Sequence, residues 1–310
     1  LPYYNSFFGT ALPPVIKLAA QLKKLAPKHI SHVFFTGSGS ESNDTNVRMV
    51  RHYWQAKGQP SKRIIISRDN AYHGSTMASM SLGGMKGMHS QGGIIDGIEH
   101  IMQPHWYHEA FAGETEEELG LRAAQALETK IIECGAENVA AFIGEPVQGA
   151  GAVIVPPSTY WPEIQRLCKK YDILLIADEV ITGFGRTGNW FASETLGIEA
   201  DLMTIAKGLS SGYMPIGGVL ISERVAKVVI ESGEFAHGYT YSGHPVAAAV
   251  ASANVSIIEN EGMIEKVRDV TGPYLQQRLA ELVDHPLVGQ VRGIGLMAAI
   301  ELVQDKESHS

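Results

Sequence analysis

The chain has 310 residues, with 25 Lys and Arg against 33 Asp and Glu, a formal net charge of -8 and 45% hydrophobic residues. This composition is typical of a folded globular protein and excludes a disordered segment. No nucleic-acid partner and no membrane partner is expected, because binding to either needs clustered Lys and Arg. The length favours about two structural units.

The cysteines, the histidines and the apolar runs make three further classes of protein improbable: disulfide-rich, metal-binding and membrane-spanning. Cys134 and Cys168 are too few for a disulfide framework and favour a reducing compartment. The histidines form no HExxH motif and accompany no CxxC pair, so no metal site is expected. No apolar run is long enough to span a bilayer, and Leu1–Pro14 has no basic region before an apolar stretch. We therefore expect a cytoplasmic protein.

A recurring pattern along the chain predicts alternating strands and helices. Five short apolar runs, each followed at once by polar residues, span 32–36, 63–67, 139–143, 173–177 and 202–206. Helical spacing of apolar residues lies between these runs, as in Val47, Val50 and Trp54. Uninterrupted apolar strands that alternate with helices predict a mostly parallel sheet with helices on both faces.

The last third of the chain departs from this pattern. The apolar run 216–221 follows the fifth strand too closely for a parallel crossover, so we expect it to be the one antiparallel strand. A long helical stretch is predicted from Pro245 to Leu282, with strands around Val288 and over 296–302. These strands are interpreted as the start of a second, smaller domain.

The predicted domain boundaries follow from this change of pattern. We expect a large domain over residues 1–255 and the beginning of a small C-terminal α+β domain over residues 256–310. Leu1 is not a natural initiator residue, and the chain stops on the polar run 306–310. Both ends therefore suggest a truncated chain that lacks an N-terminal segment and the rest of the small domain.

The first polar cluster, Ser38-Gly39-Ser40-Glu41-Ser42-Asn43, lies between a strand and a helix. Gly39 lets a ligand approach the backbone, and the helix start with the hydroxyls of Ser38 and Ser40 favours a phosphate. The alternative is an ordinary turn with a serine cap. The chain has no GxxxxGK[ST] motif and no complete GxGxxG motif, which disfavours nucleotide binding.

Two charged residues follow later strands of the predicted sheet. Asp178 ends the fourth run, where a cationic ring nitrogen could neutralise its carboxylate; backbone amides or Arg186 could do the same. Lys207 follows the fifth run, where partial desolvation would make its amine nucleophilic and suited to Schiff-base chemistry. The alternative for Lys207 is a side chain that extends into water.

Four further residues follow the second and third strands. Tyr72 has a flat ring that could stack on a planar cofactor or pack in the core, and His73 is expected to form a local hydrogen bond. Glu145 and Gln148 could face a ligand or shape a turn. Because ligands bind beyond the carboxyl ends of parallel strands, all these clusters are expected to converge. A phosphate cradle, a stacking ring, an acid and an amine together fit pyridoxal 5′-phosphate.

As a set, the motifs resemble the class III aminotransferases, which are fold-type I pyridoxal-phosphate enzymes, and within them the ω-amine (polyamine):pyruvate transaminases. The resemblance covers essentially the whole chain. It is carried by Leu1–Phe8, Ser38–Glu41, Tyr72–Gly74, Gly144–Gly149, Asp178–Val180, Gly183–Gly188, Ala206–Gly208 and Thr240–Pro245. It implies an α/β fold with a mostly parallel sheet, one antiparallel strand and part of a smaller C-terminal domain.

The resemblance also implies roles for individual residues. Lys207 and Asp178 would be catalytic: Lys207 would bind the cofactor covalently and move the proton between substrate and cofactor carbons, and Asp178 would bind the ring nitrogen. Tyr72 and Val180 would lie on opposite faces of the ring. Further cofactor contacts would come from Ser38, Gly39, Ser40, His73, Glu145, Ile181 and Thr240. Because Thr240 would belong to the partner subunit, a homodimer would be needed for a complete site.

The implied activity is a ping-pong transfer of an amino group from an ω-amine donor, such as a polyamine or β-alanine, to pyruvate or a similar oxo acid. Ile181 stands where many class III members carry Gln, which favours the ω-amine branch over 4-aminobutyrate. The arginine that binds the substrate carboxylate would lie beyond this chain, and Arg292 matches a structural part of the small domain. Two alternatives remain: an aminomutase or racemase of the same class, and a cofactor-free binding module.

Overall fold

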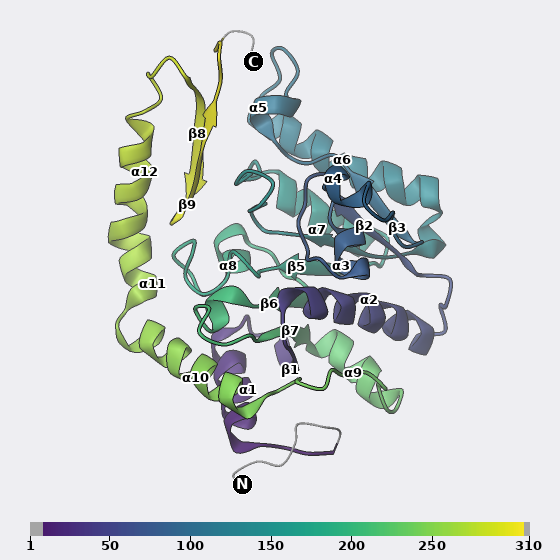
Figure 1. Ribbon diagram of the computed structural model, residues 1–310. Coiled ribbons are helices and arrows are strands. Elements are labelled where there is room, and N and C mark those ends of the chain that lie inside the picture. The colour runs from purple at the N-terminus through teal and green to yellow at the C-terminus, as the bar shows by residue number, and fades with distance from the viewer. Residues whose placement is uncertain (1–8, 307–310) are drawn as a thin grey trace.

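A seven-stranded sheet forms the centre of the computed structural model, which describes residues 9–306; the motif Leu1–Phe8 and residues 307–310 lie outside the described residues (Figure 1). Its strand order is β1-β7-β6-β5-β4-β2-β3. The strands are β1 (Ile30–Thr36), β2 (Ile64–Arg68), β3 (Ile98–Ile101), β4 (Val139–Gly144), β5 (Leu174–Asp178), β6 (Leu202–Ile205) and β7 (Gly217–Ser222). A small second sheet pairs β8 (Val288–Ile294) with β9 (Met297–Leu302).

The strand directions confirm the predicted α/β class. Strand β7 runs antiparallel to both β1 and β6, and the other neighbouring pairs are parallel. The sequence pattern missed β3, an edge strand of four residues parallel to β2. Its two central residues, Glu99 and His100, are polar and half-buried, so it lacks the apolar run that marks its neighbours.

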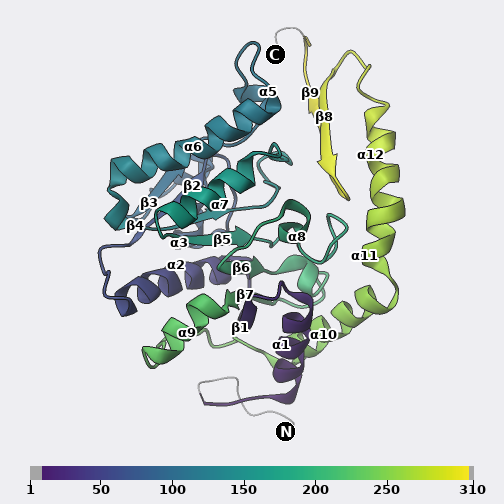
Figure 2. The same cartoon turned by 180° about the vertical axis from the view of Figure 1, so that it is seen from behind.

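Helices cover both faces of the large sheet (Figures 1 and 2). The α-helices of the described residues are α1 (Pro13–Leu25), α2 (Gly39–Ala56), α3 (Met77–Leu82), α4 (Lys86–His89), α5 (Trp106–Glu109), α6 (Glu116–Cys134), α7 (Tyr160–Lys170), α8 (Ala192–Leu196), α9 (Glu223–Glu231), α10 (Pro245–Asn260), α11 (Met263–Lys266) and α12 (Gly272–Ala280). In β5, Leu174 and Ile176 belong to the core cluster that includes residues of α2 and α9, whereas Leu175 and Ala177 belong to the cluster that includes residues of α1, α6, α7 and α10. Both faces of β5 are therefore buried, which explains its uninterrupted apolar sequence.

Helices α10, α11 and α12 lead from the large sheet to the β8–β9 hairpin. The long helix predicted there is interrupted, because Gly262 adopts a positive φ of 60° between α10 and α11 and residues 267–271 form a π-helical turn. Helix α12 and the hairpin lie to one side of the seven-stranded sheet in both views (Figures 1 and 2). The division into residues 1–255 and 256–310 stays a prediction.

Two expectations about the chain as a whole concern its thiols and its longest helices. Cys134 and Cys168 are both free, and burial raises the pKa of the Cys168 thiol. Among the helices of residues 9–306, none combines the length and apolar character that a membrane crossing requires.

Candidate active site

The carboxyl ends of the parallel strands meet around a cavity of about 170 Å³. Nine of the predicted site residues line it: Gly39, Ser40, Tyr72, His73, Glu145, Asp178, Val180, Ile181 and Lys207. Gly74 and Ala206 complete the lining. Ser38 and Thr240 do not line this cavity. The fold therefore brings together polar clusters that are spread over about 170 residues of sequence.

The start of α2 forms the base of the cavity. Ser38 caps this helix, and its hydroxyl accepts a hydrogen bond from a backbone N–H in the first turn. A Cβ atom on Gly39 would lie 3.0 Å from a methyl carbon of Val180, so the close contact favours glycine. The Ser40 hydroxyl accepts a hydrogen bond from the backbone N–H of Ser75 at 3.1 Å. The helix N-terminus provides backbone N–H groups suited to a phosphate.

Gly74 supports this cradle from the loop after β2. Its φ of 134° is unfavourable for any residue with a side chain. A Cβ atom at this position would lie 2.4 Å from the Ser40 hydroxyl oxygen. The glycine that follows Tyr72 and His73 is therefore required by the approach of two backbones.

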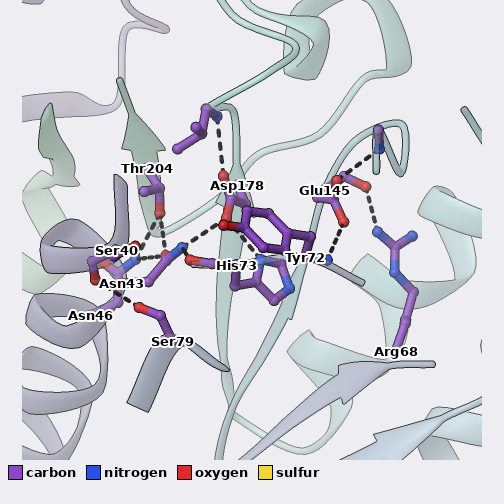
Figure 3. A network of polar contacts seen from close by, with 12 residues as sticks. Ser40, Asn43, Asn46, Arg68, Tyr72, His73, Ser79, Glu145, Asp178 and Thr204 are labelled. Carbon is purple, nitrogen blue, oxygen red and sulfur yellow. Dashed lines mark hydrogen bonds and ion pairs between the residues drawn. The ribbon is translucent and has the colours of Figure 1, made fainter. Parts of the chain in front are cut away.

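Asp178 is the buried carboxylate of the cavity, only 3% exposed at the end of β5. Its Oδ1 accepts a hydrogen bond from the backbone N–H of Val180 at 3.1 Å. Its Oδ2 accepts hydrogen bonds from Nδ2 of Asn43 at 2.8 Å and Nδ1 of His73 at 2.7 Å (Figure 3). Within residues 9–306 no Lys or Arg, Arg186 included, lies within ion-pair distance of Asp178. The expected local hydrogen bond of His73 is thus to this carboxylate.

Asn43, Asn46 and Thr204 form a buried network behind Asp178 that the sequence analysis missed (Figure 3). Nδ2 of Asn43 also donates to the backbone carbonyl of His73 at 2.7 Å. Oδ1 of Asn43 accepts from Nδ2 of Asn46 at 3.0 Å and from the Thr204 hydroxyl at 2.9 Å. These bonds use both donors and both lone pairs of the Asn43 amide and so fix its orientation. Two asparagines three positions apart on one helix face were the available signal.

Glu145 joins the loop after β2 to the loop after β4 through hydrogen bonds of its carboxylate. Its Oε1 accepts from the backbone N–H of Tyr72 at 3.1 Å, and its Oε2 accepts from that of Gly149 at 2.8 Å. Its own carbonyl accepts from Arg68 at 2.6 Å (Figure 3). Burial raises the pKa of Glu145. Glu145 therefore both lines the cavity and shapes a turn, whereas Gln148 is buried outside the lining.

Lys207 lines the cavity and lies two residues after the end of β6. Its backbone has a φ of 38°, a left-handed conformation that costs a non-glycine residue on the order of 1 kcal/mol or more. The expected desolvation of Lys207 is wrong for the single chain, because the residue is exposed.

Thr240 lies in the segment before α10 and lines a separate cavity of about 850 Å³ together with Phe34 and His237. Burial and the neighbouring Arg48 lower the pKa of His237 to about 4. The chain does not bring its own Thr240 to the Asp178 cavity. The predicted contact from Thr240 of the partner subunit stays a prediction.

One cavity of a mostly parallel sheet thus brings together a buried carboxylate, a lysine and a helix N-terminus. The chain belongs to the class III aminotransferase family, whose model matches residues 3–310. Enzymes of this family use pyridoxal 5′-phosphate, so the recognition and the cofactor expected from the sequence are both confirmed.

Within this family the chain is similar to several characterised proteins. It is 60% identical over 309 residues to the putrescine–pyruvate aminotransferase of Pseudomonas aeruginosa. The match covers 99% of this chain and 68% of that protein. It is 46% identical to the diaminobutyrate–2-oxoglutarate transaminase of Halomonas elongata, covering 98% and 66% of the two chains. Among solved structures, the ω-transaminase of Pseudomonas jessenii in complex with PMP has a TM-score of 0.97 at 50% identity, covering 100% of this chain and 69% of that one. The chain thus spans about two thirds of the length of these relatives.

Proposed function

We propose that this chain transfers an amino group from an ω-amine donor to pyruvate, or a similar oxo acid, in two half reactions. The observation that carries this proposal is one cavity that both Lys207 and Asp178 line. The similarity to a putrescine–pyruvate aminotransferase and to ω-transaminase structures supports the donor class and the acceptor.

The residues of the cavity suit the phosphate, the ring and the charge of the cofactor. The start of α2 at Gly39 and Ser40 would hold the phosphate, because backbone N–H groups point outward there and Gly39 leaves room beside Val180. Tyr72, held by its backbone bond to Glu145, would cover one face of the ring, and Val180 would cover the other. The bound cofactor supplies an electron sink for the carbon that loses a proton.

Asp178 would bind the protonated ring nitrogen of the cofactor. Asn43 and His73 hold its Oδ2 from behind, so the carboxylate is fixed before the ring arrives. No Lys or Arg of residues 9–306 pairs with Asp178. A ring nitrogen would therefore provide its positive counter-charge, and the carboxylate would keep that nitrogen protonated near neutral pH.

The Lys207 ε-nitrogen would act as acid and base in both half reactions. It would accept the proton that leaves the substrate carbon and return a proton on the other side of the same transfer. Lys207 lines the cavity from the short helical turn of residues 207–209 that follows β6.

The site would be completed by a second copy of the chain, with Thr240 of the partner subunit contacting the phosphate. Two facts support this arrangement: the chain's own Thr240 lines another cavity, and the Asp178 cavity measures only about 170 Å³. That volume is below the roughly 300 Å³ typical of the smallest ligand sites. We propose a cytoplasmic homodimer.

Borohydride reduction followed by peptide mapping tests the role of Lys207. The cofactor label is expected on Lys207 and not on Lys170 or Lys227, and Lys207→Ala should show no turnover. A label on either of the other lysines would contradict the assignment. Protein that stays colourless after pyridoxal phosphate is added would favour a cofactor-free binding module.

A panel of amines and oxo acids tests the reaction class and the donor. An ω-amine such as putrescine should discharge the yellow form of the enzyme, and pyruvate should restore it with release of alanine. An aminomutase or racemase would instead return nitrogen to the donor skeleton without needing pyruvate. The panel should use the full-length protein beside the 310-residue chain, because the relatives extend beyond the matched region.

A further inference from the structure

Two histidines and a glutamate form a cluster away from the Asp178 cavity, where α5 lies beside the β8–β9 hairpin (Figures 1 and 2). His105 immediately precedes α5, His108 lies in α5, and Glu301 is on β9. One ring nitrogen of each histidine and one carboxylate oxygen of Glu301 all lie within 4.8 Å of one another. Nothing in the proposed transaminase reaction uses these residues.

His105 gives an independent reason to expect a ligand. The residue is 4% exposed, and its Nε2 atom is buried with no hydrogen-bond partner among the described residues. Buried polar atoms in folded proteins are nearly always satisfied. An imidazole in its neutral form offers one nitrogen lone pair to a metal ion.

We propose that His105, His108 and Glu301 bind one divalent transition-metal ion, with zinc as the best-fitting example. Two imidazole nitrogens and one carboxylate oxygen are a ligand set that zinc uses, with water at the fourth position. Nε2 of His108 lies 3.3 Å from Oε1 of Glu301, about the separation of two ligand atoms in a tetrahedral zinc site. The exposed His108 side chain can move to close the remaining gap to His105.

Arg292 orients the carboxylate from its far side. Its Nη1 lies 2.7 Å from Oε2 of Glu301, and its Nε donates to the backbone carbonyl of Ala152 at 2.9 Å. The guanidinium therefore occupies one carboxylate oxygen and leaves Oε1, which faces His108, available to a metal. Hydrogen-bonded partners of this kind fix metal-ligating carboxylates. The positive charge of Arg292 also weakens cation binding, so we expect a lower affinity than that of a four-ligand structural zinc site.

The consequence of binding would be a link between distant parts of the chain. His108 and Glu301 are 193 residues apart in sequence. A metal ion held by both would tie the β8–β9 hairpin to α5 and raise the unfolding temperature of the chain, since a ligand that binds only the folded state stabilises it. This effect is independent of transaminase activity.

Zinc titration of the purified 310-residue chain against a chromophoric metal indicator tests the proposal. The chain is first stripped with a chelator, and cofactor is kept at one concentration in all samples so that any metal bound to it is constant. We expect one zinc ion per chain, with an affinity at least about tenfold lower in His108→Ala. Because His108 is exposed, this variant should fold like the wild type. Cobalt in place of zinc should give visible absorption bands that His108→Ala loses.

His89 and His100 provide the matched control. They also form a ring pair, with centroids 5.2 Å apart, but both hydrogen bond to the Gly83 carbonyl, and no carboxylate of residues 9–306 completes a ligand set with them. His89→Ala should leave zinc affinity unchanged. The proposal is overturned if the wild type binds no zinc, if His108→Ala binds it equally well, or if His89→Ala loses as much affinity as His108→Ala.

Discussion

Two aspartates at opposite ends of neighbouring strands, one buried and one partly buried, are stabilised in different ways. Asp178 ends β5, whereas Asp201 immediately precedes the neighbouring strand β6. Asp201 accepts a hydrogen bond from the backbone N–H of Leu175 at 3.0 Å and pairs with Arg224 at 3.3 Å. The carboxylate of Asp178 instead has amide, imidazole and backbone donors, without a Lys or Arg from residues 9–306.

The two carboxylates differ in whether a Lys or Arg of the described residues pairs with them. This difference indicates which one binds a ligand better than the size of the adjacent cavity does. The cavity beside Asp201 measures about 510 Å³, three times the volume of the cavity beside Asp178. Asp201 already has a cation from its own chain in Arg224, so it has no need of a ligand. Asp178 is fixed and desolvated but has no such cation, which suits a carboxylate that binds a cationic group of a ligand.

Asp178→Asn should cause the largest loss of turnover among the variants considered. A neutral amide cannot hold a proton on the cofactor ring, so turnover should fall by at least about 100-fold while the unfolding temperature changes little. Steady-state kinetics and thermal unfolding on the same samples measure both. Activity near the wild-type level would show that the carboxylate is structural.

Asn43→Ala should lower turnover by about 10- to 100-fold, because Asp178 would lose one of the two side chains that hold its Oδ2. Thr204→Val is the matched control, since it removes a hydrogen bond to Asn43 and none of the hydrogen bonds described above for the Asp178 carboxylate. Both variants should lose stability, but only Asn43→Ala should also weaken cofactor binding, measured by absorbance titration. Equal cofactor affinities in the two variants would rule out a positioning role for Asn43.

Asp201→Ala should have the opposite profile to Asp178→Asn. It leaves the buried N–H of Leu175 without an acceptor, so the free energy of unfolding should fall by about 1–3 kcal/mol with turnover per folded chain unchanged. Urea unfolding measures the change. Asp172→Ala serves as a control, because Asp172 also pairs with Arg224 but is exposed, and its loss should cost less than about 1 kcal/mol.

The smallest expected effect is the pH dependence of the difference in unfolding free energy between the wild type and Asp201→Ala. Burial raises the pKa of Asp201 above its unfolded value of 3.8, despite Arg224. The folded state then binds the proton more tightly, so the contribution of Asp201 is complete below the unfolded pKa and declines as pH rises through the folded pKa. The free-energy gap between wild type and Asp201→Ala should therefore shrink from about pH 4 to pH 7. A gap that widened over this range would mean that Arg224 outweighs the burial.

The sequence predicted the elements whose signal is local. Strands β4 and β5 are apolar throughout because both of their faces are buried, and β7 follows β6 too closely for any but an antiparallel return. The edge strand β3 is half polar and was missed. The long C-terminal helix was predicted without its breaks, because a glycine turn and a π-helical turn leave little trace in apolar periodicity.

For the candidate site, the sequence by itself determined which residue types stand at or just after the strand ends, including Asp178, Lys207 and the serines at the start of α2. These follow from periodicity, because parallel strands place their carboxyl ends at one edge. Only the tertiary structure decided which partner each residue has: that Asn43 holds Asp178, that Arg224 neutralises Asp201, and that Lys207 is exposed in the single chain. Hydrogen bonds and ion pairs depend on distances between segments far apart in the chain, and no spacing within one segment encodes them.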